Sequence, residues 1–135
     1  MGNRITNRRH GDMAGLNMSN GLTDVFMDVL ALNTSALAGS EDEKRLAVWL
    51  AQHNQSFLGA GTVGFDIQDM PWSESDFERQ KDFLIRGIQA AKTKRLWEKL
   101  PYEPLADHVM DVLSRFRLLL EAFQKADVDP AVLRA

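Results

Sequence analysis

The sequence contains no cysteine. Its 135 residues therefore form no disulfide, hold no thiolate-bound metal and supply no thiol nucleophile. Long apolar runs are missing as well, since none approaches the roughly 20 residues that a membrane-spanning helix needs. The arginines near the start are not followed by the apolar stretch of a secretion signal. We therefore expect a protein of the reducing cytoplasm without a membrane segment.

Signatures of several enzyme classes are also missing. The chain has no G-x-S-x-G elbow, which serine hydrolases use, and no Glu-x-x-His pair, which a di-iron helical bundle requires. Its three histidines, His10, His53 and His108, lie in separate segments, and none has a partner at metal-ligand spacing. The sequence therefore favours a protein without a catalytic centre, a metal or a cofactor.

One short motif points the other way. Residues 59–64, Gly-Ala-Gly-Thr-Val-Gly, match G-x-G-x-x-G, in which glycines let a dinucleotide pyrophosphate approach a backbone turn. That chemistry needs a strand before the motif and a helix directly after it, whereas here a predicted helix comes before and an irregular segment follows. We interpret the motif as a glycine-rich loop that crosses one end of the fold.

The charge balance disfavours nucleic acid as a partner. The net charge is −3, and residues 1–12, with three arginines and one aspartate, contribute +2, so the remainder carries −3 minus +2, or −5. A body of that sign repels phosphate backbones. We expect another protein as the partner, and a homo-oligomer stays open.

Apolar spacing predicts an all-α fold. A hydrophobic content of 44% over 135 residues is enough for one domain with its own core. In four segments apolar residues recur three and four positions apart, as they do along one face of a helix. The predicted helices cover 23–37, 41–57 and 73–98, and a fourth starts near 104 and ends before 127. We expect them to pack as an irregular four-helix bundle.

Two segments fall outside this helical pattern. Residues 1–20 have almost no apolar periodicity, and we predict a flexible arm there that contributes little to the core of the helical domain, residues 21–135. Residues 62–67, Thr-Val-Gly-Phe-Asp-Ile, are the only β-like run. We expect a loop at this point that contains at most a short extended piece.

The starts of the second and third helices carry capping boxes. In such a box a serine side chain binds the backbone three residues on, and the acid at that position binds back. The boxes are Ser40 with Glu43 and Ser73 with Asp76, and the third helix adds a hydrophobic staple between Trp72 and Phe77.

Acidic residues gather before and within the start of the third helix. The thirteen residues 66–78 hold five acids and no base, namely Asp66, Asp69, Glu74, Asp76 and Glu78. Their spacing fits no calcium-binding loop. The helix macrodipole favours acids at a helix start and accounts for the last three. It leaves Asp66 and Asp69 without an explanation.

The rest of the predicted third helix reverses this sign. Residues 79–99 hold seven bases and two acids, a local charge of +5. Cations are favoured near a helix C-terminus, but Lys92, Lys94 and Arg95 exceed what capping needs. We predict a basic docking patch at this end.

These observations lead to one principal hypothesis about function. The chain is predicted to be a small, non-enzymatic protein-interaction module of the cytoplasm. Toxin-neutralising immunity proteins are one instance of such a module, by an analogy that rests on size, acidity and the lack of catalytic residues. The predicted interaction surface comprises Asp66, Asp69, Trp72, Lys92, Lys94 and Arg95.

Two alternatives stay open. The first is an enzyme for a small ligand, or one assisted by a metal, with its site between residues 59–72 and the second and third helices and with Asp66, Asp69 and His53 as its polar groups. The second is a peripheral membrane protein, because the first six residues match the pattern for myristoylation on Gly2 and the nearby arginines would add an electrostatic attraction to a membrane.

Overall fold

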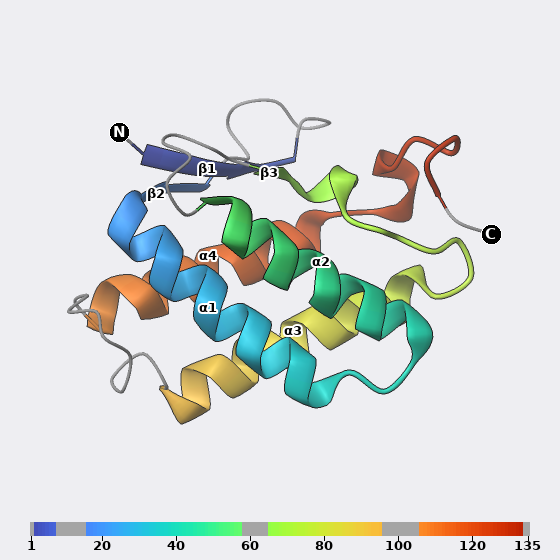
Figure 1. The fold of residues 1–135 in the computed structure, drawn as a ribbon. Coiled ribbons are helices and arrows are strands. Elements are labelled where there is room, and N and C mark those ends of the chain that lie inside the picture. The colour runs from blue at the N-terminus through green and yellow to red at the C-terminus, as the bar shows by residue number, and fades with distance from the viewer. Residues whose placement is uncertain (1, 8–15, 58–64, 96–105, 134–135) are drawn as a thin grey trace.

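The computed structural model describes residues 2–7, 16–57, 65–95 and 106–133, and this part of the chain is mostly helical (Figure 1). The helices contribute most of the core, which makes the fold all-α, as the apolar spacing predicts. The α-helices are α1 (Asn20–Leu37), α2 (Glu41–Phe57), α3 (Phe77–Lys94) and α4 (Ala106–Ala122), and two short 3₁₀ turns are η3 (Ile67–Asp69) and η5 (Lys125–Asp127).

The helix bounds agree best with the predictions for α2, which begins and ends where it was expected. Helix α1 ends at the predicted residue and begins three residues early, at Asn20. Helix α3 is shorter than predicted at both ends, since it begins at Phe77 and its C-cap is Arg95, in the left-handed conformation at φ 50°. In α2 the apolar pattern agrees with the cap formed by Ser40 and Glu43, which is why its bounds could be found.

A small sheet lies along one side of the helices. Strands β1 (Gly2–Thr6), β2 (Leu16–Ser19) and β3 (Phe65–Asp66) are ordered β2-β1-β3, with β1 antiparallel to β2 and parallel to β3. Figure 1 shows the sheet near the start of α1 and the end of α2. Strand β3 lies at the end of the run that was expected to be a loop with a short extended piece, and residues 62–64 of that run lie outside the described residues.

The structure corrects the expectation that residues 1–20 contribute little to the core. Ile5 and Leu16 face each other across β1 and β2, and they are only 1% and 3% exposed. The arm shows no helical periodicity because its described residues pair as strands, in which side chains alternate between faces instead. Residues 8–15 lie outside the described residues, and flexibility there stays a prediction.

The core is organised around α1, which packs against the other three helices. Phe26 of α1 meets Phe116 of α4 edge to face, with ring centroids 5.5 Å apart. Between α1 and α3 the approach is close, because a Cβ placed on Gly87 would lie 2.7 Å from Cγ2 of Thr34. A glycine in the middle of α3 is therefore explained by packing, even though glycine weakens a helix by about 1 kcal/mol.

The two predicted capping boxes have different outcomes. The first is confirmed: the Glu43 N–H donates to Oγ of Ser40 at 3.2 Å, and Oε1 of Glu43 accepts from the N–H groups of Ser40 and Gly39. The second is wrong. Helix α3 begins four residues after Ser73, and Asp76, at the N-cap position, makes no side-chain capping bond.

The side chain of Gln80 explains why Ser73 and Asp76 do not form a capping box. Its Oε1 accepts the Ser73 N–H at 2.8 Å and its Nε2 donates to the carbonyl of Pro71 at 3.0 Å, so residues 71–73 bind to α3 rather than extend it. The predicted staple is confirmed, since the rings of Trp72 and Phe77 lie 5.0 Å apart.

Candidate functional site

Two of the predicted surface residues are buried and serve the fold. Asp66 is 7% exposed, and its carboxylate accepts from Oγ1 of Thr6 at 2.8 Å and from the N–H of Gln68 at 2.9 Å. This explains the acid that the helix dipole left unexplained, because Asp66 joins β1 to η3. Trp72 is 1% exposed, and its Nε1–H donates to the carbonyl of Ile67 at 2.6 Å.

The aromatic cluster around Trp72 also fixes a lysine. The rings of Trp72, Phe77 and Phe123 lie 5.0 to 5.4 Å apart in pairs. Beside them Lys81 is 8% exposed, its Nζ donates to the carbonyl of Phe123 at 2.5 Å, and it lies 5.8 Å from the Phe77 ring centroid. One of the seven bases in the basic stretch is therefore an internal group that ties α3 to the end of α4.

The other predicted surface residues do not join this cluster. Asp69 is exposed at the end of η3. Lys92, at the far end of α3, donates to Oγ of Ser114 on α4 at 3.1 Å, whereas Lys94 and Arg95 are exposed. An 18-residue helix is about 27 Å long at 1.5 Å per residue. The structure therefore does not bring the two halves of the predicted surface together.

The acids at the start of α3 do not form a cation site in the described part of the chain. Glu74 pairs with Lys125, with Oε1 and Nζ 3.2 Å apart. Among the described residues no three histidine or acidic side chains are arranged to hold a metal ion. The side chain of His53 is not among those described, and the glycine motif at 59–64 lies outside the described residues.

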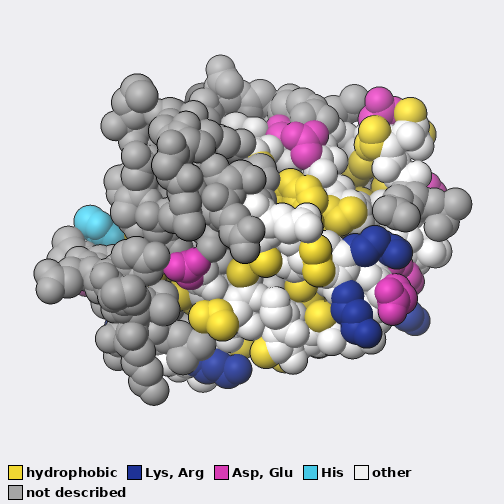
Figure 2. Space-filling model, viewed as in Figure 1, with side chains coloured by type: hydrophobic (Ala, Val, Ile, Leu, Met, Phe, Trp, Pro, Cys, Tyr) yellow, Lys and Arg dark blue, Asp and Glu magenta, His cyan; other side chains and the backbone are white. Residues whose placement is uncertain are grey.

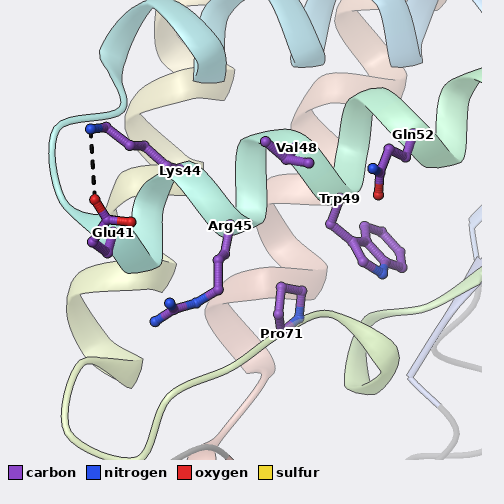
Figure 3. Close-up of a pocket in the computed structure, with 7 residues that line it drawn as sticks. All are labelled: Glu41, Lys44, Arg45, Val48, Trp49, Gln52 and Pro71. Atoms are coloured by element: carbon purple, nitrogen blue, oxygen red, sulfur yellow. Dashed lines mark ion pairs between the residues drawn. The ribbon is translucent and has the colours of Figure 1, made fainter.

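A hollow with a different lining opens between α2 and the segment that Gln80 holds. Its volume is about 330 Å³. In Figure 3 Arg45 and Trp49 extend from α2 toward the Pro71 ring, whereas Lys44 and Val48 lie on the side of α2 away from it. We call it the α2–Pro71 groove, and it is lined by Glu41, Lys44, Arg45, Val48, Trp49, Gln52 and Pro71.

The middle of the groove is apolar. Val48 is 52% exposed, although it is a large aliphatic side chain. Trp49 is half-buried and meets the ring of Phe65 in β3 edge to face, at 5.1 Å between centroids. Figure 2 shows hydrophobic side chains gathered over the middle of the α1–α2 side, with charged side chains beside them near the start of α2.

The charges lie at one end of the groove. Lys44 and Arg45 come one turn before Val48 and Trp49 on the same face of α2. Nζ of Lys44 lies 3.8 Å from Oε1 of Glu41, and Arg45 forms an ion pair with Asp42. The groove therefore joins an apolar centre to a charged rim.

Sequence reasoning missed the groove, although a signal was present. The lining residues of α2 are three and four positions apart, so they share one face. The core residues Leu46 and Leu50 form a neighbouring stripe, and Val48 falls between the two along the chain and off that stripe. The contribution of Pro71 could not be foreseen, because it depends on the hydrogen bond from Gln80.

Comparison of the chain with protein-family models, with curated proteins and with solved structures finds no match. Among the helices that the structure describes, none is both long enough and apolar enough to cross a membrane.

Proposed function

We propose that this protein is a non-enzymatic protein-interaction module and that the α2–Pro71 groove is where it contacts its partner. The observation that carries the proposal is the exposure of Val48 in a groove that Trp49 and Pro71 also line. Protein interfaces have apolar centres with aromatic anchors and polar rims, and a few such residues supply most of the binding energy. The groove has the same composition on a small scale.

The rigid surroundings of the groove support this proposal. Pro71 is held through its carbonyl by Gln80, which is fully buried, and Trp49 is held against Phe65. A surface that is already ordered loses little conformational entropy on binding. We propose this surface in place of Asp66 and Trp72, whose side chains are occupied inside the fold.

The proposed setting is the cytoplasm, on the argument from the missing cysteines. Neutralisation of a toxin, as by an immunity protein or an antitoxin, is one role that such a module would fill, and it follows from the analogy of size and charge alone.

The small-ligand alternative shares part of this location. Pro71 belongs to the 59–72 segment that this alternative names, but the described lining includes no residue of α3 and neither Asp66 nor Asp69. Its volume is at the lower end of the range for ligand pockets, about 300–1,000 Å³. A ligand bound there would raise the melting temperature of the isolated protein in a concentration-dependent way.

The myristoyl alternative depends on Gly2. In the structure Gly2 belongs to β1 and is paired with Ser19 of β2. If this alternative holds, Gly2→Ala will abolish membrane association and leave partner capture unchanged.

The direct test is partner capture with Val48→Asp. The tagged full chain, the variant and Leu118→Asp are used to isolate bound proteins from lysate of the source organism. Leu118 is a matched control because it is 65% exposed and lies on α4. We expect a stoichiometric partner that is retained by the wild type and Leu118→Asp and lost with Val48→Asp. Equal capture by all three proteins would refute the assignment to the groove.

A further inference from the structure

The charges on α2 indicate which kind of protein segment fits the groove, an inference that rests on the function proposed above. We infer that the α2–Pro71 groove accepts a segment in which a large apolar side chain lies next to a carboxylate. The apolar side chain packs on Val48, Trp49 and Pro71, and the carboxylate meets Lys44 and Arg45.

The apolar part of the groove has room for one anchor. The volume of about 330 Å³ lies at the small end of known pockets, and Val48, Trp49 and Pro71 supply three apolar surfaces around it. A single aromatic or large aliphatic side chain would cover the exposed Val48 and thereby remove apolar area from water, which is the main source of binding energy at such contacts.

Two of the three acids at the start of α2 are ion-paired and lie outside the groove lining. The Asp42 side chain is 10% exposed and pairs with Arg45. The Glu43 side chain is 17% exposed, caps α2 through Oε1, and lies with Oε2 3.6 Å from Nη2 of Arg86 on α3. Of these three acids, only Glu41 lines the groove. A segment in the groove therefore meets Lys44 beside Glu41, and Arg45 whose ion-pair partner Asp42 lies outside the groove lining.

That remaining acid is a weak competitor. The Glu41 side chain is 82% exposed and that of Lys44 is 57% exposed, and the 3.8 Å separation between them is close to the limit for an ion pair. Exposed pairs of this kind contribute little stability. A carboxylate from a partner can replace Glu41 at Lys44 with little loss, and it would be less exposed to solvent, so its attraction would be stronger.

The contacts of Arg45 are a second reason to expect a carboxylate in the partner. One carboxylate, that of Asp42, pairs with its guanidinium, while its Nε is buried and has no acceptor among the described residues. An unmet buried donor costs about 1–3 kcal/mol. An incoming carboxylate that draws the guanidinium outward would satisfy this donor as well.

The spacing on α2 sets the spacing in the partner. Residues three and four apart on a helix have Cβ atoms roughly 5–6 Å apart, which is the separation between Lys44 and Val48 along the groove. In the partner an apolar residue and an acid meet this requirement when they lie one turn apart on a helix or close together on an extended segment. A basic residue in place of the acid would face Lys44 and Arg45 and be repelled.

The test is a selection of random dodecapeptides, displayed on phage, against the full-length protein. Enriched peptides are synthesised, and their affinities are measured for the wild type, Val48→Asp and Lys44→Glu. The matched controls are Leu118→Asp and Lys94→Glu, because both residues are exposed and lie outside the groove lining. Circular dichroism confirms that each variant is folded.

We expect the enriched peptides to combine an apolar anchor with an acid. Their affinity should fall at least about tenfold with Val48→Asp and about tenfold with Lys44→Glu at low salt, and it should stay unchanged with both controls. Peptides that depend on Val48 but carry no acid, or that bind Lys44→Glu as well as the wild type, would overturn this inference and leave the proposed function standing. A selection that yields no peptides dependent on Val48 would overturn both.

Discussion

The α1–α2 hairpin is stabilised by contacts between residues close in the sequence, whereas the seam between β1 and η3 is stabilised by contacts between residues far apart in the sequence. In the hairpin, Ser40 and Glu43 bind each other three residues apart. In the seam, Thr6 binds Asp66 across 60 residues, and Asn7 accepts from Gln68 across 61. The bounds of the hairpin can be read from the sequence because its stabilising contacts are local. The seam cannot be predicted in this way, because the sequence of neither segment indicates which other segment it will contact.

We therefore expect the largest losses of stability from substitutions that break contacts between segments far apart in the sequence. The largest effect is expected for Trp72→Ala, which removes a buried ring from between Phe77 and Phe123 and leaves the Ile67 carbonyl without its donor. We expect a loss of about 3–5 kcal/mol in the free energy of unfolding. Urea denaturation followed by far-UV circular dichroism measures it.

The control for Trp72→Ala is Val132→Ala, at a site that is 57% exposed. It should change stability by less than about 0.5 kcal/mol. If the two substitutions had similar effects, the aromatic cluster would not be the anchor of the 65–73 segment.

The next largest effect is expected for Ile5→Ala. Ile5 is 1% exposed in β1, and its truncation should cost about 2–5 kcal/mol, as for other buried aliphatic residues. The same urea titration applies, and Leu118→Ala is the exposed control. An effect below about 0.5 kcal/mol would restore the original expectation that the first twenty residues are a flexible arm.

The smallest effect is expected in the hairpin. Ser40→Ala removes the acceptor for the Glu43 N–H and should lower stability by about 1 kcal/mol. Ser35→Ala, at an exposed position inside α1, is the control and should be neutral or slightly stabilising, because alanine favours helix. A loss above about 3 kcal/mol with Ser40→Ala would mean that the hairpin depends on more than its local cap.

The four helices could be predicted because each carries its own signal. Apolar residues three and four apart, with Gly39 and Ser40 between the first two helices, are sufficient to locate α1 and α2. The start of α3 could not be located as well, since it depends on whether Ser73 or Gln80 satisfies the local backbone. Strands β1 and β2 were missed because a short strand is stable only when it pairs with another segment, whereas β3 lies in the run that was expected to contain a short extended piece.

The candidate site was predictable in part. The sequence marks Asp66 and Trp72 as unusual, and both prove to be unusual for structural reasons. It also places Val48 off the stripe of Leu46 and Leu50, which is the one local sign of the groove. The other side of the groove comes from Pro71, nineteen positions after Gln52, and becomes a wall only when the whole domain has folded.

The parallel pairing of β1 with β3 has a consequence for how the protein is made. Ile5 and Phe65 are register partners, so β1 leaves the ribosome well before the strand that completes its sheet. At 5–20 residues per second, the interval for 60 residues is about 3–12 s. During that time β1 has only β2 as a partner, and one of its edges stays open to other nascent chains. Synthesis rate and chaperone supply should therefore affect the yield of folded protein.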